Sequence, residues 1–424
     1  MSEQKTVVIM ATLDTKGEEA AFVRDEITAS GLDTILIDPG ILGNPSVAAD
    51  ITRYDVAKAA GTALEILVAQ GKKGDAIAKQ TEGLCRIVKD LYATGRLDGI
   101  IGLGGGQGTS IGTAAMRLLP LGVPKLMVST IASGTFQFGP YVGTKDICVM
   151  YSVTDILGLN TFSRPILRNA ANAIAGMVLR HQVEQQVGKP AIAITMLGMT
   201  TSCVMRVKKK VEEQGYEVVP FHASGTGGPA MEESIEAGRF VGVIDLNTHE
   251  MMDDLHGGLG RAPGRLEALT RFRIPAVVSV GGNDFILFET LEKAPAKYQG
   301  GRRTMVHNAQ MTIVQPTPEE MRESARVMAD RLNRALGPTL VLLPLRGFTD
   351  PNREGREMWG PEGNQAMIDE LRMRLRPEVP TVLVDAHIND PQFAEVIADC
   401  MVDLVKGKSP KDIAARYYSA IERK

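Results

Sequence analysis

The feature that most constrains this fold is a recurring pattern of short aliphatic and β-branched runs. Each run ends in Gly, Asp, Ser or Thr and is followed by a helical pattern. The runs are apolar throughout instead of alternating with polar residues. Strands of that kind are buried on both faces, as in a parallel sheet covered by helices. The pattern therefore predicts an α/β protein.

The predicted strands form two groups. The first contains residues 6–14, 34–40, 99–105, 125–130 and 147–153, and the second contains residues 190–198, 217–223, 242–248, 276–282, 339–345 and 381–386. The predicted helices cover residues 18–29, 75–94, 108–118, 164–186, 203–214, 319–336, 364–375 and 391–405. A chain of 424 residues is too long for one typical core. We therefore predict two Rossmann-like domains, residues 1–188 and 189–424, each an open, mostly parallel sheet flanked by helices.

A glycine-rich segment follows the third predicted strand, and in open α/β sheets ligands bind beyond the carboxyl ends of the strands. Missing Cβ atoms let backbone amides approach a phosphate at the start of a helix. The residues expected to contact phosphate are Gly104, Gly105, Gly106, Gly108 and Thr109. The segment is not a Walker loop. It looks like the glycine loop of iron-type alcohol dehydrogenases, but that group's spaced histidines are absent. A generic strand-to-helix turn is the alternative.

Two further loops after predicted strands suit an anionic ligand. The first strand leads into Asp14, Thr15 and Lys16, and the fourth leads into Ser133, Gly134 and Thr135. The first group fits contact with phosphate or Mg²⁺, although an N-cap role for its Asp or Thr explains it equally well. The second group is rich in hydroxyls, with a purely structural turn as its alternative. Anion-binding loops after neighbouring strands favour a phosphorylated ligand.

Polar side chains also follow the predicted strands of the second half. Those expected to carry chemistry are His222, Asp245, His249, Arg346 and His387. Histidines near Asp and Asn favour general acid–base catalysis or metal binding, whereas a lone histidine is more often structural. Their spacing matches no zinc signature, so the sequence specifies no metal. The arginine suits a carboxylate or phosphate of the ligand.

The composition argues against several classes of protein. A net charge of −3 and an aromatic content of 5% do not fit a broad nucleic-acid-binding face. Four scattered cysteines suggest a reducing compartment. The N-terminus has no signal-peptide core, and no apolar run approaches the ~20 residues needed to cross a bilayer. We therefore expect a cytoplasmic protein that binds neither nucleic acid nor membranes.

Seven ordered motifs carry a family resemblance: ATLDTKG, GLGGGQGT, GVPKLMVSTIASG, YSVTDILGLN, FHASGTGG, PLRGF and HINDP. In this order they resemble the uncharacterised protein family that contains the N-terminal ATP-binding domain of the tomato mosaic virus resistance protein. The resemblance implies two Rossmann-like subdomains, binding of ATP with Mg²⁺, and a homodimer. Gln107 departs from the small residue expected at its position.

These observations predict a protein that binds ATP and Mg²⁺ through its first domain. We expect it to be an ATP-dependent enzyme acting on a small anionic metabolite at the interdomain cleft. In that reading Arg346 binds the anionic group, and His222, His249 or His387 transfers protons. Two alternatives stay open. One is a non-catalytic, nucleotide-binding regulatory module, and the other is a hydrolase or isomerase whose phosphate loop binds substrate.

Overall fold

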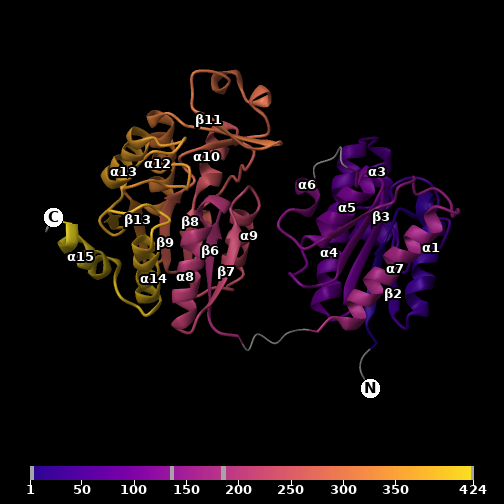
Figure 1. Ribbon diagram of the computed structural model, residues 1–424. Helices are drawn as coiled ribbons and strands as arrows, with labels where there is room; N and C mark the ends of the chain where they lie inside the picture. The colour runs from indigo at the N-terminus through magenta and orange to yellow at the C-terminus, as the bar shows by residue number, and fades with distance from the viewer. Residues whose placement is uncertain (1–3, 134–137, 183–187, 422–424) are drawn as a thin grey trace. The chain divides into compact units, whose positions relative to one another are not determined.

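The computed structural model describes residues 4–133, 138–182 and 188–421. The chain divides into two compact units, Met1–Gln185 and Gln186–Lys424. Each unit contains a parallel sheet with helices on both of its faces (Figure 1). This arrangement confirms the predicted α/β class with two Rossmann-like domains.

The sheet of the first unit has the strand order β2-β1-β3-β4-β5, with all neighbours parallel. Its strands are β1 (Thr6–Met10), β2 (Asp33–Ile37), β3 (Gly99–Gly104), β4 (Lys125–Ser129) and β5 (Cys148–Tyr151). Its helices are α1 (Leu13–Ala29), α2 (Arg53–Ala59), α3 (Leu64–Ala69), α4 (Lys73–Ala93), α5 (Gly106–Met116), α6 (Gly139–Val142) and α7 (Ser163–Arg180). One face of the sheet packs against α1 and α7, and the other packs against α2, α4 and α5.

The main sheet of the second unit has the order β14-β13-β9-β8-β6-β7 and is also parallel. Its strands are β6 (Ala191–Met196), β7 (Glu217–His222), β8 (Gly242–Asn247), β9 (Ala276–Gly281), β13 (Thr339–Pro344) and β14 (Thr381–Val384). Its helices are α8 (Thr201–Glu213), α9 (Gly227–Glu236), α10 (His249–His256), α11 (Glu267–Arg271), α12 (Pro318–Leu332), α13 (Pro361–Arg374), α14 (Pro391–Val405) and α15 (Pro410–Ile421). One face packs against α9 and α11 to α13, and the other packs against α8, α14 and α15.

A small antiparallel sheet in the second unit was not predicted. It consists of β10 (Ile286–Phe288), β12 (Met311–Val314) and β11 (Thr304–Asn308), in that order. It lies above the carboxyl ends of the main strands (Figure 1). A separate apolar cluster joins it to the loops after these strands, with Leu197, Ala223, Phe285, Ile313 and Met358 as its buried members. The carboxyl end of this parallel sheet is therefore covered by the chain's own residues.

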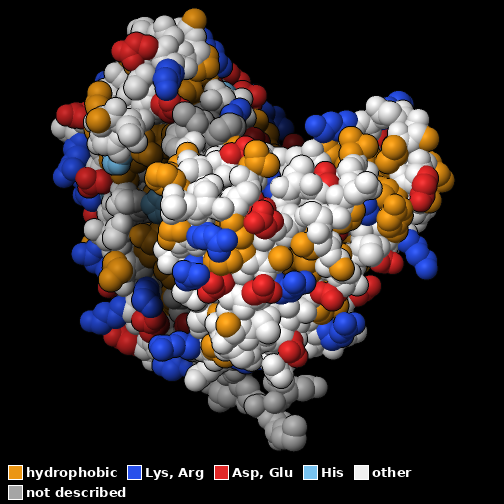
Figure 2. Space-filling view, turned by 90° about the vertical axis from the view of Figure 1, so that its right-hand side faces the viewer, with side chains coloured by type: hydrophobic (Ala, Val, Ile, Leu, Met, Phe, Trp, Pro, Cys, Tyr) orange, Lys and Arg blue, Asp and Glu red, His pale blue; other side chains and the backbone are white. Residues whose placement is uncertain are grey.

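The predicted elements begin and end close to the observed ones, with two main differences, while the helices α2, α3, α6, α9, α10, α11 and α15 were not predicted. The first strand ends at Met10, because the predicted end of that strand already belongs to α1. The predicted helix over residues 164–186 ends at Arg180, where His181 takes an extended backbone conformation. Within the described part of the chain, no helix is long and apolar enough to cross a membrane. On the face shown in Figure 2, Lys and Arg side chains are interspersed with Asp and Glu.

Candidate functional site

A pocket of about 450 Å³ lies in the first unit, at the carboxyl ends of β2, β1 and β3. Its lining residues are Thr12, Asp14, Thr15, Lys16, Ile41, Leu42, Leu67, Val68, Gly71, Lys72, Lys73, Ala76, Gly105, Gly106, Gln107 and Gly108. The turn after β1 and the glycine loop after β3 therefore meet in one pocket. Parallel strands end at the same edge of a sheet, which is why loops distant in sequence converge here.

Three helices begin at the wall of this pocket. Their N-cap residues are Thr12 for α1, Lys72 for α4 and Gly105 for α5, and none of these side chains caps its helix. In contrast, α2 is closed by a capping box between Thr52 and Asp55. Uncapped first turns leave backbone N–H groups without helical partners, at the positive end of each helix dipole. In α1 the N–H of Leu13 already donates to Asp38 Oδ1 at 3.2 Å, so α1 offers fewer free N–H groups than α4 and α5. This wall is therefore suited to an anion.

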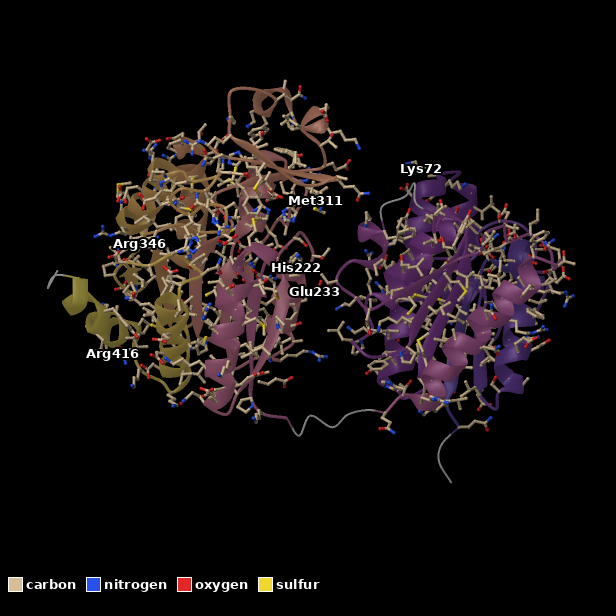
Figure 3. All side chains as sticks on the ribbon, in the orientation of Figure 1. Lys72, His222, Glu233, Met311, Arg346 and Arg416 are labelled. Atoms are coloured by element: carbon tan, nitrogen blue, oxygen red, sulfur yellow. The ribbon has the colours of Figure 1, made fainter. Side chains whose placement is uncertain are left out.

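The charged side chains of the pocket are predominantly cationic. The lining residues include Lys16, Lys72 and Lys73 but one carboxylate, that of Asp14. Lys16 Nζ donates to the carbonyl of Ile156 at 3.0 Å, which holds its ammonium group in place. Lys72, labelled in Figure 3, is 75% exposed and lies 4.0 Å from Asp75, so its charge is only weakly compensated. An ammonium group offers three donors, and a phosphate group accepts several.

The glycines of the loop differ in whether the protein leaves space for a side chain at their position. A Cβ at Gly104 would come within 2.7 Å of the Gly108 backbone, so the turn itself needs a glycine there. A Cβ at Gly105 would meet only Thr130 Oγ1 at 3.5 Å, and one at Gly106 would meet nothing within 4 Å. Neither residue has a positive φ. Packing and backbone conformation therefore leave these two positions free for a side chain, and both line the pocket.

A buried arginine fixes the wall formed by the loop after β2. Arg53 Nε donates to Asp38 Oδ2 at 2.7 Å, and Nη1 donates to the carbonyls of Leu42 and Gly43 at 2.6 and 2.8 Å. Its Nη2 lies 3.6 Å from Asp14 Oδ1, so the same guanidinium also contacts the carboxylate of Asp14 that lines the pocket. Because Asp38 is 1% exposed and paired in this way, it is not available to a ligand.

The remaining wall of the pocket is apolar. It is made by Ile41 and Leu42 after β2, by Leu67 and Val68 on α3, and by Ala76 on α4. These residues, and Lys72 and Lys73, were not predicted from the sequence, because they do not directly follow a predicted strand of the site. The lining of the pocket therefore combines cationic and backbone N–H groups with an apolar wall.

Three predicted residues of the first unit lie elsewhere, and two are outside the described residues. Gly104 is the buried end of β3. Thr109 is also buried, and its hydroxyl lies 2.6 Å from that of Ser129 in a hydrogen bond, so it does not line the pocket. Ser133 does not line it either. Gly134 and Thr135 lie outside the described residues.

In the second unit, Asp245 belongs to a buried charge cluster. Arg265 donates to both carboxylate oxygens of Asp245 at 2.7 and 2.8 Å, to Glu250 at 2.7 Å and to Glu232 at 2.8 Å. Asp245 also accepts from the hydroxyl of Thr195 at 2.9 Å. Burial opposes the charge on the guanidinium, but its three carboxylate partners outweigh that effect and raise the pKa of Arg265. The contacts of Asp245 are those of a structural ion pair.

His249 is also buried and contacts residues of its own unit. Its Nδ1 lies 2.9 Å from the carbonyl oxygen of Gly282, and its Nε2 lies 3.2 Å from Asp253 Oδ2. Its ring stacks on that of Phe285. Burial works to lower the pKa of His249, but the Asp253 carboxylate and the Gly282 carbonyl outweigh it and raise that pKa. The Asp253 pair lies within α10, whereas the contacts with Gly282 and Phe285 connect α10 to the loop after β9.

His387 is held between two loops. Its Nδ1 lies 2.9 Å from Arg353 Nη2, and its Nε2 lies 2.9 Å from the carbonyl oxygen of Thr349. Since the guanidinium can only donate, Nδ1 is the acceptor and Nε2 carries the hydrogen. Burial lowers the pKa of His387, which favours this neutral form. Both ring nitrogens are therefore occupied.

Arg346 and His222 lie at the surface, on opposite sides of the second unit in Figure 3. Arg346 forms a two-bond pair with Asp385, at 2.7 and 3.0 Å. His222 ends the edge strand β7, whereas His387 follows the opposite edge strand, β14. Those two strands are separated by five strand spacings, or roughly 24 Å at about 4.8 Å each. The predicted catalytic residues are thus not brought together around one reacting atom.

The described residues contain no group of three or more His, Cys, Asp or Glu side chains arranged to hold a metal ion. A divalent cation in the first unit's pocket would therefore find one carboxylate, Asp14, among the lining residues. Mg²⁺ is commonly bound by one or two carboxylates together with substrate phosphates and water. The residues present fit a cation that arrives with a phosphorylated ligand.

The fold and pocket define a two-unit α/β protein with an anion-suited pocket in its first unit. The N-terminal and C-terminal domains of the uncharacterised protein family UPF0261 match residues 5–183 and 189–405. The chain belongs to this family. A UPF0261 protein of Clostridium tetani is 41% identical over 404 residues, covering 95% of this chain and 99% of the relative. One of Rhizobium meliloti is 39% identical, covering 94% and 99%.

The tomato relative indicated by the motifs is also found. The ToMV resistance protein Tm-1 of Solanum lycopersicum is 36% identical over 349 residues, covering 80% of this chain but 45% of the tomato protein. This confirms the predicted family resemblance. Among solved structures, a putative UDP-N-acetylglucosamine 2-epimerase of Listeria monocytogenes is 11% identical with a TM-score of 0.23, covering 65% of this chain and 79% of its own. So low a similarity supports no conclusion about the site.

Proposed function

We propose that the pocket of the first unit binds a nucleotide, ATP together with Mg²⁺. The observation that carries the proposal is the mixed lining of this pocket. It combines uncapped helix starts and three lysines with an apolar wall. A nucleotide has the same two parts, a polyanion and a flat, weakly polar base. The family resemblance carried by the motifs points to the same ligand.

The apolar wall favours a nucleotide over a sugar phosphate. A sugar presents hydroxyl groups in all directions, and Ile41, Leu42, Leu67 and Val68 have no side-chain donors or acceptors to pair with them. Burying an unpaired hydroxyl costs roughly 1–3 kcal/mol on protein mutational scales. A purine base presents two apolar faces, which such a wall can cover. The alternative in which the glycine loop binds a phosphorylated substrate is therefore less well supported.

Mg²⁺ would be held by the phosphates of the nucleotide and by Asp14. This carboxylate already lies 3.6 Å from Arg53, whose charge reduces its attraction for a cation. We therefore expect the cation to bind much more tightly with the nucleotide than alone.

The contacts of the predicted catalytic residues in the second unit favour a non-catalytic role for this protein. His249 and His387 are buried with both ring nitrogens close to polar partners of their own unit, and Asp245 is paired with Arg265. A nucleotide-binding regulatory module needs no proton-transfer groups, so this arrangement supports that candidate as the second function. An ATP-dependent reaction on a small anionic metabolite, its location at the interdomain cleft and the homodimer stay predictions.

Calorimetric titration with ATP and Mg²⁺ tests the proposed function. We expect saturable heat with the unchanged protein and at least tenfold weaker binding, about 1.4 kcal/mol, when Lys72 and Lys73 are both replaced by Ala. Both lysines are exposed, so the folded unit should tolerate their loss. The matched control is Lys89→Ala, which removes an exposed lysine of the same helix away from the pocket.

Gly106→Ala supplies an independent test, because its new Cβ meets no protein atom within 4 Å. We expect weaker ATP binding with an unchanged thermal midpoint. Its control is Gly176→Ala on α7, where a Cβ also meets nothing within 4 Å and lies outside the pocket. The proposal is wrong if ATP gives no heat, or if the pocket variants bind ATP as tightly as the two controls.

A further inference from the structure

We infer that this pocket holds its base by apolar contact alone and does not distinguish adenine from guanine. The inference rests on the proposed function, because it concerns the same pocket. It goes further in naming the ligand class, purine nucleoside polyphosphates in general.

No side chain of the apolar wall can form a hydrogen bond with the edge of a base. Ile41, Leu42, Leu67, Val68 and Ala76 have neither donors nor acceptors. Adenine and guanine differ at the purine C6 position, which carries an amino donor in one and a carbonyl acceptor in the other, and along the adjoining N1 and C2 positions, where guanine alone has donors. Selecting one of them requires a matching group opposite one of these positions.

Four backbone carbonyls at or beside this wall already accept a hydrogen bond from the chain. Gly40 O accepts from Gln80 Nε2 at 2.8 Å, and Leu42 O and Gly43 O accept from the Arg53 guanidinium. On the other side, Val68 O accepts from the N–H of Gly71 at 3.1 Å. These carbonyls are thus occupied by the chain itself, and Gln80 is not among the lining residues.

The polar side chains of the pocket come mostly from other segments. The exceptions are Lys72 and Lys73, exposed ammonium groups next to the apolar wall in the chain, which we assign to the phosphates. Thr12, Thr15 and Lys16 belong to the turn after β1, and Gln107 lies in the first turn of α5 beside Gly106. These groups surround the position expected for the phosphates. Contacts to the polyphosphate should therefore supply most of the binding free energy, and contacts to the base should supply a part that depends on its apolar area.

A site without a hydrogen bond to the distinguishing atom discriminates weakly. Pockets that bind by apolar contact separate similar ligands by roughly 10–200-fold, whereas those that hydrogen-bond the distinguishing group reach about 10⁴–10⁵-fold. Adenine and guanine have similar apolar faces. We therefore expect their dissociation constants to differ by less than tenfold, with inorganic triphosphate binding more weakly than either nucleotide.

The test is calorimetry of the full chain with ATP, GTP and inorganic triphosphate, each with Mg²⁺. Leu42→Ala removes apolar area from the wall at a side chain that is 62% exposed, so folding is not at risk. It should weaken ATP and GTP by the same factor, about three- to tenfold, and leave triphosphate unchanged. Leu157→Ala, at an exposed residue of the same unit outside the pocket, is the control and should change none of the three.

The outcomes separate this inference from the proposed function. Comparable ATP and GTP binding, with equal losses in Leu42→Ala, supports the inference. A preference above tenfold for either nucleotide overturns it while leaving nucleotide binding in place, as do unequal losses in the variant. If neither nucleotide binds, the proposed function itself fails, and the inference fails with it.

Discussion

At the scale of single residues, Asp284 is an unusual carboxyl group. It follows β9 and is 2% exposed, and its Oδ2 accepts a hydrogen bond from the hydroxyl of Thr349. Its Oδ1 is buried without a hydrogen-bond partner among the described residues. Burial raises the pKa of Asp284 to about 6, against the smaller lowering effect of the Thr349 hydroxyl. The charged form is thus disfavoured in the folded protein.

This carboxyl group makes stability depend on pH in a defined direction. The folded protein binds the proton of Asp284 more tightly than the unfolded chain, so the resulting stability is complete below pH 3.8 and is lost as the pH rises through 6. A rise in pKa from 3.8 to about 6 corresponds to about 3 kcal/mol. Asp284→Asn keeps an acceptor for Thr349 and cannot ionise. We expect it to be more stable than the unchanged protein by up to that amount at pH 7.5.

Urea unfolding at several pH values measures this difference. The gain in free energy of unfolding from Asp284→Asn should shrink between pH 6 and pH 4 and vanish below pH 4. Thr349→Val is a comparison that removes the hydroxyl without changing the titrating group, and it should leave the pH dependence in place. A gain from Asp284→Asn that stays constant between pH 4 and pH 8 contradicts the account.

Residue patterns in the sequence predicted only part of the site. The turn with Asp14 and the loop with Gly106 were expected to contribute to the same ATP and Mg²⁺ site, because each follows a parallel strand. Val68 on α3 and Lys72 in the connection between α3 and α4 could not be found in that way, since neither follows a strand and their positions depend on how these helices pack. In the second unit, strand-end position alone did not show that His249 already has an internal partner in Asp253.

At the scale of elements, the parallel strands were predictable because continuous apolar runs are required to bury both of their faces. The helix α4 was predictable for a related reason, since its buried residues recur along one side. The small sheet was missed because its strands are short and only one side of it is covered. β11 in particular is mostly exposed, so its residues show no buried pattern.

The packing of this small sheet gives an element-scale prediction. Ile313 of β12 is fully buried in the cluster that joins the sheet to the strand-end loops. Ile313→Ala should lower the free energy of unfolding by about 2–5 kcal/mol, through lost burial and a cavity. The matched control is Val306→Ala on β11, at a side chain that is 73% exposed, and it should change stability by no more than about 0.5 kcal/mol.

Chemical denaturation of both variants provides the measurement. Equal, small losses for the two substitutions would mean that the small sheet does not pack on the carboxyl ends of the main strands. In that case the strand ends of the second unit would be open to a ligand.

At the scale of the whole molecule, the local charge of the pocket opposes the charge of the chain. The protein has a net charge of −3, yet three lysines and one carboxylate line the pocket of the first unit. An anionic ligand is therefore attracted by the local site against a weakly repulsive total charge. In the second unit, the charges near the strand ends are largely paired with one another, as in Arg346 with Asp385 and Arg353 with Asp390.

Hydrogen exchange of the full chain with and without ATP and Mg²⁺ tests the central claim most directly, because it reports where backbone amides become protected. We predict slower exchange in three separate segments of the first unit, residues 12–16, 72–75 and 105–109, which contain the uncapped helix starts. Exchange at residues 345–360 of the second unit should not change. Protection confined to the strand-end loops of the second unit, or no protection at saturating ATP, would contradict the account.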